Sequence, residues 1–188
     1  SRGKKRFDDC LESIWKEKDC LYFLATQPNL GEESPLHFQL KEFIVRYYAK
    51  EQGLEGKGQD ENQIRNEIKR EIPTEYELPN TDIIADVYSR RDSLAIEAET
   101  LYEGELGSLK QTLSKYEGKS FPPRIILSNL TFLRHFKELK ALKEKHYQNL
   151  DLVFWTLNLK EGSPIPLSDI EEKTRELWSE IKTIQKLN

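Results

Sequence analysis

Apolar residues recur along the chain at two spacings, and each spacing predicts a type of secondary structure. Spacings of three and four residues predict a short helix within 1–34 and longer helices at 36–52, 61–70, 106–116, 130–148 and 168–187. Short apolar runs predict strands at 72–78, 82–89, 93–100, 124–128 and 150–157. Pro73 interrupts the first run, which therefore predicts an edge strand.

The order of these elements predicts an α/β fold. A helix, three strands, a helix, a strand, a helix and a strand follow one another, which is an α/β layer arrangement. We expect three parts: an N-terminal helical extension at 1–34, a core at 35–160 and a C-terminal helix at 161–188. The length of 188 residues suits one such domain.

Composition narrows the class of protein. Charged residues make up 33% of the sequence and hydrophobic residues 37%, which is typical of a folded, soluble domain. No apolar run approaches the roughly 20 residues that span a bilayer, so no membrane attachment is expected. Cys10 and Cys20 fit no zinc or iron–sulfur spacing and suit a reduced cytoplasmic protein, with a disulfide between them as the alternative. The net charge of −4 does not itself favour nucleic acid, but a carboxylate site is acidic until metal binds.

An aspartate lies within the most apolar of the predicted strands. Asp86 stands between Ala85 and Val87, in a strand at 82–89 with apolar residues on both faces. Burying a carboxylate there is costly unless it meets a cation or several hydrogen-bond donors. A salt bridge to a nearby lysine or arginine and a metal-binding role both meet this requirement.

Two glutamates follow on the next predicted strand. Glu97 and Glu99 share one face roughly 7 Å apart, where they repel each other unless positive charge lies between them. Glutamate and alanine are also poor strand residues, so Ala-Ile-Glu-Ala-Glu is a weak local choice for a strand. Residues that disfavour a strand without visible compensation indicate a functional role. The alternative is that both glutamates simply lie on a face of the strand exposed to solvent.

The turn between these two strands decides whether the three acids meet. A two-residue turn at Arg90-Arg91, or a four-residue turn at 89–92, pairs Asp86 with Ala95. All three acids then lie on one side of the sheet, with Asp86 and Glu97 as diagonal neighbours. An oxygen-only cluster of this kind favours Mg²⁺ or Mn²⁺ over zinc.

This arrangement resembles the motif of the PD-(D/E)xK nuclease superfamily. In that motif an Asp, a short hairpin and Glu-x-Lys follow in order; here Asp86 matches the Asp, Glu97 the acidic ligand, and Glu99 the position usually held by Lys. The order of elements over 36–157 also resembles the superfamily core, with a helix before the strands and another after the Glu strand. The resemblance implies a restriction-endonuclease-like core, with a central mixed β-sheet flanked by helices.

The resemblance also implies an Mg²⁺- or Mn²⁺-dependent phosphodiesterase. Asp86, Glu97 and Glu99 are then the metal ligands, and Glu99 holds metal or accepts the proton of the attacking water. In some members the lysine stands on the following helix, where Lys110 is the candidate here and would stabilise the developing negative charge. A solvated surface lysine is the alternative for Lys110.

Nucleic acid, DNA rather than RNA, is the expected partner. Basic residues on the predicted helix at 130–148 are compatible with phosphate contacts or with an ordinary solvated helix. His37 opens the helix before the sheet, where it either reaches substrate phosphate or is simply half-exposed. Because the chain starts at Ser1 and contains no methionine, we expect a domain of a larger nucleic-acid-processing protein, with a homodimer or a fused partner domain as further possibilities.

Two rival hypotheses remain open at this stage. One is a catalytically inactive module on the same fold that binds nucleic acid or a protein partner, since the motif lysine is replaced. The other is a structural α/β domain whose acidic strand is neutralised by salt bridges.

Overall fold

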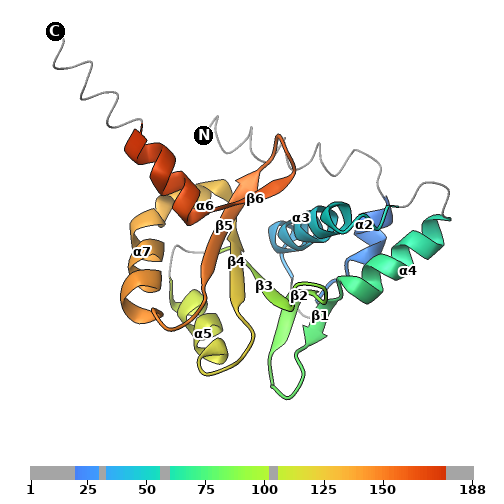
Figure 1. Ribbon diagram of the computed structural model, residues 1–188, viewed down its shortest axis with the longest axis horizontal. Helices are drawn as coiled ribbons and strands as arrows, with labels where there is room; N and C mark the ends of the chain where they lie inside the picture. The colour runs from blue at the N-terminus through green and yellow to red at the C-terminus, as the bar shows by residue number, and fades with distance from the viewer. Residues whose placement is uncertain (1–19, 30–32, 56–59, 102–105, 177–188) are drawn as a thin grey trace, which may run out of the picture.

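A six-stranded mixed sheet forms the centre of the computed structural model, which describes residues 20–29, 33–55, 60–101 and 106–176 (Figure 1). The strands follow one another across the sheet in chain order: β1 (Thr74–Glu77), β2 (Ile84–Ser89), β3 (Leu94–Glu99), β4 (Pro123–Leu127), β5 (Val153–Asn158) and β6 (Ser163–Pro166). Neighbouring strands are antiparallel from β1 to β3 and between β5 and β6, and parallel from β3 to β5. The predicted α/β fold with a central mixed sheet is confirmed.

Helices cover both faces of this sheet (Figure 1). One group consists of α2 (Cys20–Ala25), α3 (Pro35–Glu51) and α4 (Glu61–Glu71), and the other of α5 (Gly107–Tyr116), α6 (Asn129–Arg134) and α7 (Phe136–Ala141). On β4, Ile126 packs into the core beneath α3, whereas Ile125 and Leu127 pack into the core beneath α5, α6 and α7. Burial on both faces explains why this strand is a continuous apolar run. None of the described helices is long and apolar enough to cross a lipid bilayer.

The start of α3 is fixed by a helix cap. The Ser34 side chain accepts a hydrogen bond of 3.2 Å from the backbone N–H of His37, and Pro35 occupies the first helical position. The rest of the helix packs on β2 and β3 through a row of buried residues that includes Ile44 and Val45. The cap therefore holds His37 in the first turn, beside the sheet.

Two elements differ from the sequence-based expectation. The single helix expected at 130–148 is divided into α6, α7 and the π-helical segment η2 (Leu142–His146), because His135 adopts non-helical angles between the first two. β6 lies within 161–188, the part of the chain expected to form the C-terminal helix; its Pro164 and Pro166 are tolerated because it is an edge strand. Residues 167–176 are helical as expected. Of the range 1–34 expected to contain a short helix, 20–25 form α2, whereas 1–19 and 30–32 lie outside the described residues, as does the end of the expected C-terminal helix, 177–187.

Candidate functional site

The turn of the hairpin between β2 and β3 lies one residue later than the expected four-residue turn at 89–92 and is two residues longer than the expected two-residue turn. Ser89 pairs with Leu94, and Val87 with Ile96, so residues 90–93 form the turn. The predicted pairing of Asp86 with Ala95 is therefore wrong by two residues. The Ser89 hydroxyl donates a 2.7 Å hydrogen bond to Asp92, which closes the turn.

The difference in register is an even number of residues, so each acid stays on the expected face of the sheet. The new register also brings Asp86 and Glu97 closer together. Continuing the observed register places Asp86 directly across from Glu97 instead of diagonal to it. The paired ladder ends at Val87 and Ile96, and beyond it the backbone N–H of Ala98 donates a 2.8 Å hydrogen bond to Asp86 Oδ2. The Asp86 carboxylate thus lies between β2 and β3 and accepts the hydrogen bond that a backbone carbonyl would accept if the ladder continued.

Helix α5 supplies hydroxyl groups to the two glutamates. The Tyr116 hydroxyl donates a hydrogen bond to Glu97, and Thr112 Oγ1 donates one of 2.7 Å to Glu99 Oε1. Thr112 and Tyr116 are four residues apart and therefore lie on one face of the helix. Tyr116 ends the predicted helix at 106–116, and the need of a buried tyrosine hydroxyl for a partner is the available signal for this contact.

The glutamates hold their protons more strongly than exposed glutamates do. Burial raises the pKa of Glu97 well above its ordinary value, and the negative charge of Asp86 raises it further, against the lowering effect of the Tyr116 hydrogen bond. Burial also raises the pKa of Glu99, partly opposed by the hydrogen bond from Thr112. Like-charge crowding of buried carboxylates, expected from the sequence, is therefore present at this site.

His37 approaches the same carboxylates from α3. Its Nε2 forms an ion pair with Asp86, 3.0 Å from Oδ2, and lies 3.8 Å from Glu33 Oε1. Burial lowers the pKa of His37, and the contacts with Asp86 and Glu33 outweigh that effect and raise it overall. Sequence reasoning left the role of this histidine open, since the helix cap that positions it was not recognised.

A buried lysine joins two more carboxylates to the cluster. Lys41, one turn after His37, is completely buried, and its Nζ lies 2.9 Å from Glu33 Oε1 and 2.5 Å from Glu75 Oε1. The register of β1 and β2 places Glu75 opposite Asp86. Burial raises the pKa of Glu75, while Lys41 opposes this effect. Glu75 also has a φ of 50°, a left-handed conformation that side chains other than glycine rarely adopt.

The predicted site residues are thus brought together in part. Asp86, Glu97 and Glu99 lie on adjacent strands at one end of the hairpin. Lys110 is exposed on α5, two residues from Thr112, which corresponds to about 200° around the helix, so it points away from the face that contacts the acids. Its catalytic role stays a prediction. Within the described ranges, no three histidine, cysteine, aspartate or glutamate side chains form a ready-made metal-binding group.

Comparisons with protein-family models, with curated proteins and with solved structures give no match. The fold class, a mixed open sheet with helices on both faces, is defined by the structure itself. Its membership of a nuclease superfamily stays an expectation from the motif.

Replacing Glu97 by glutamine tests the electrostatic state of this cluster. Because the pKa of Glu97 is raised by folding, the folded state binds more protons than the unfolded state above pH 4.3, about the unperturbed glutamate value. Stability should therefore fall as the pH rises through and above this value. We expect Glu97→Gln to be more stable than the wild type near neutral pH and similar to it at acidic pH, as measured by urea unfolding over a pH series.

The exposed Glu77 on β1 provides the matched control. Glu77→Gln should leave the pH dependence of unfolding unchanged. If Glu97→Gln instead lowers stability at neutral pH, folding stabilises the charged form of Glu97. Other contacts then outweigh the repulsion between Glu97 and Asp86.

Proposed function

We propose that the protein is a metal-dependent nuclease that hydrolyses phosphodiester bonds of nucleic acid at the Asp86–Glu97 site. The observation that carries this proposal is the placement of these two buried carboxylates across from each other on β2 and β3, where they repel each other. Among the ion pairs between described residues, none joins either one to a lysine or arginine. Asp86 is paired with His37 instead and accepts a hydrogen bond from Ala98 N–H, so an acidic strand stabilised by such contacts is the structural alternative that the metal-binding test below must exclude.

The chemistry of the donors fits a hard divalent cation. Mg²⁺ commonly binds proteins through one or two carboxylates and completes its coordination with waters and substrate phosphate, so a group of three protein ligands is not required. Asp86 and Glu97 are the two carboxylates that would hold it, and Glu99 stands one residue pair further along β3. When bound, the cation would lower the pKa of a water molecule and polarise a phosphate.

The surrounding side chains position these carboxylates. The Ala98 N–H fixes the orientation of Asp86, and the Tyr116 hydroxyl fixes that of Glu97. Such contacts to the ligands hold a metal site in its working geometry. The ring nitrogen of His37 lies 3.0 Å from Asp86 Oδ2, so His37 would exchange a proton with this carboxylate, and Asp86 favours its charged form. Glu99, hydrogen-bonded to Thr112, is the carboxylate available as an acceptor for the proton of water.

A binding module without catalysis is the second candidate. One observation favours it: Glu99 stands where the resembling nucleases usually carry lysine, and the exposed Lys110 points away from the acids. A domain of this kind would retain the carboxylate site and grip nucleic acid or a protein partner without cutting. The two candidates differ only in turnover, so a cleavage assay separates them.

The test combines metal binding with cleavage. We expect the wild type to bind Mn²⁺ in calorimetric titration, more tightly as the pH rises because Glu97 must lose its proton to become a ligand. We also expect it to cleave at least one of single-stranded, duplex or branched DNA or RNA in Mg²⁺ and not in EDTA. Glu97→Ala should lose both properties.

Each outcome decides between the hypotheses. Mn²⁺ binding without cleavage of any substrate supports the binding module. No Mn²⁺ binding, or binding unchanged in Glu97→Ala, excludes the metal site. Cleavage that survives in Glu97→Ala places the active site elsewhere.

A further inference from the structure

Four side chains form a row of alternating charge that leads from the interior of the protein to Asp86. The Nζ of the fully buried Lys41 lies 2.9 Å from Glu33 Oε1, and the same oxygen lies 3.8 Å from His37 Nε2. That ring nitrogen lies 3.0 Å from Asp86 Oδ2. Because neighbouring charges attract each other, the position of each side chain in this row depends on the charge of the one before it.

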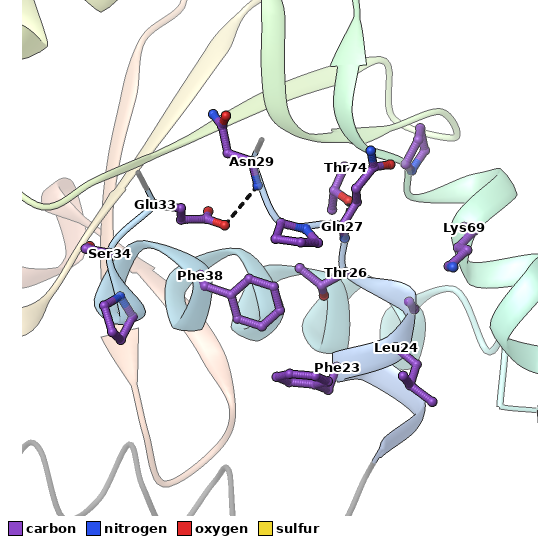
Figure 2. Close-up of a pocket in the computed structure, with 14 residues that line it drawn as sticks. Phe23, Leu24, Thr26, Gln27, Asn29, Glu33, Ser34, Phe38, Lys69 and Thr74 are labelled. Carbon is purple, nitrogen blue, oxygen red and sulfur yellow. Dashed lines mark hydrogen bonds between the residues drawn. The ribbon is translucent and has the colours of Figure 1, made fainter. Parts of the chain in front are cut away.

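Glu33 is held firmly through both of its carboxylate oxygens. Oε1 accepts a hydrogen bond from the Lys41 ammonium, and Oε2 accepts one of 3.0 Å from the backbone N–H of Asn29, drawn as the dashed line in Figure 2. The Glu33 side chain is 6% exposed and lies at the wall of a cavity of about 760 Å³, the one shown in Figure 2. It directly precedes Ser34, which caps α3. Glu33 therefore presents a fixed negative charge to His37 in the first turn of that helix.

At the other end of the row, two donors meet on one oxygen of Asp86. The backbone N–H of Ala98 lies 2.8 Å from Oδ2, and His37 Nε2 lies 3.0 Å from the same atom. Two contacts from different elements, β3 and α3, restrict the rotation of this carboxylate. With Oδ2 held in this way, Oδ1 is the oxygen with which Asp86 would bind a cation.

We propose that Glu33 is a positioning residue of the acidic site, which holds His37 against Asp86 Oδ2 and thereby fixes the orientation of the Asp86 carboxylate. Its effect on metal binding and cleavage rests on the proposed function, whereas its effect on the orientation of Asp86 exists without metal. The alternative is that Glu33 serves only as a counter-ion of Lys41. In that case its removal lowers stability, but no effect of its removal depends on His37.

The first measurement follows two NMR signals in the full chain without metal. One is the ring signal of His37, identified by its loss in His37→Ala, and the other is the amide signal of Ala98, whose proton is bonded to Asp86. We expect Glu33→Gln to shift both signals, because a neutral amide attracts the charged His37 ring less strongly than a carboxylate does. In the His37→Ala background, Glu33→Gln should cause no further shift of the Ala98 signal.

The second measurement repeats this comparison with metal. Glu33→Gln should weaken Mn²⁺ binding in calorimetric titration roughly 10- to 100-fold, the range typical of groups that orient a metal ligand. The rate of Mg²⁺-dependent cleavage should fall with it. In the His37→Ala background the same substitution should have no further effect on either quantity, because the contribution of Glu33 passes through His37.

Glu75→Gln is the matched control, because it removes the other carboxylate that is paired with Lys41. Any effect it has on the Ala98 signal or on Mn²⁺ binding should be the same with and without His37. Thermal unfolding verifies that each variant is folded at the temperature of measurement. Should Glu33→Gln fail to fold, Glu33→Asp keeps the negative charge beside Lys41 but shortens the side chain by one methylene, and it should shift the same two signals.

Each result supports or overturns the positioning role of Glu33. An Ala98 signal that does not move in Glu33→Gln, or an effect of Glu33→Gln that is equal with and without His37, overturns it. Coupled shifts in a wild type that neither binds Mn²⁺ nor cleaves nucleic acid support the positioning role and remove the nuclease. Mn²⁺ binding and cleavage that depend on Asp86 but are insensitive to Glu33 support the nuclease and remove the positioning role.

Discussion

Lys41→Met is expected to destabilise the protein by about 3–5 kcal/mol, the cost typical of removing one partner from a buried ion pair. Lys41 is fully buried, and its ammonium is shared by Glu33 and Glu75, whose side chains are 6% and 15% exposed. Methionine preserves most of the volume but leaves both carboxylates without their cation. The free energy of unfolding in urea at neutral pH is the measurement that checks this.

Two controls separate charge from packing in this experiment. Lys110→Met removes an exposed lysine and should change stability by less than about 0.5 kcal/mol. The triple variant Lys41→Met, Glu33→Gln, Glu75→Gln should recover much of the lost stability, because the uncompensated charges are gone. The deficit of Lys41→Met should also shrink as the pH falls, since Glu75 has a raised pKa and becomes neutral first. A loss that is unchanged by pH would mean that packing, and not charge, is the function of Lys41.

Asp86→Asn is expected to reduce phosphodiester cleavage roughly a thousandfold or more. Electrostatic stabilisation of a phosphoryl transition state by a metal site is worth several kcal/mol, and each 1.36 kcal/mol is a factor of about ten in rate. The asparagine oxygen can still accept the hydrogen bond from Ala98 N–H, so the strands should keep their arrangement. Initial cleavage rates in Mg²⁺, compared with those of the wild type, measure the effect.

Asp82 provides the control for Asp86, because it is an exposed aspartate four residues earlier in the chain. Asp82→Asn should cleave at the wild-type rate and bind Mn²⁺ normally. If both variants lose activity equally, the loss reflects overall charge near the hairpin. Full activity in Asp86→Asn would disprove the assignment of this residue.

Secondary structure and fold class could be predicted from the sequence wherever the spacing of apolar residues within one element is sufficient to identify it. The apolar runs of β2 and β4 and the helical stripe of α5 appear directly as periodicity. β6 could not be recognised in this way, because Pro164 and Pro166 argue against a strand unless its position at a sheet edge is known. The break at His135, whose backbone angles are non-helical, has no signal in the local apolar pattern of 130–148.

The sequence predicts the face of the sheet on which each acid lies, but not which residues pair across the hairpin. Side chains alternate along a strand, so any even shift of register keeps Asp86, Glu97 and Glu99 on one face. The shift itself, set by the Ser89–Asp92 hydrogen bond, was not predictable from turn length. His37 and Glu75 join the site through tertiary contacts from α3 and β1, which lie far from the motif in sequence.

The two outer strands of the described sheet limit how copies of the protein can associate. On β6, Pro164 and Pro166 cannot donate backbone hydrogen bonds, so the alternate residues Ser163 and Ile165 are the ones that can donate to β5, and the outer edge lacks donors. On β1, the left-handed backbone at Glu75 interrupts the extended conformation that an added strand requires. Neither edge of the described sheet is therefore suited to pairing with a strand from a second copy of the chain.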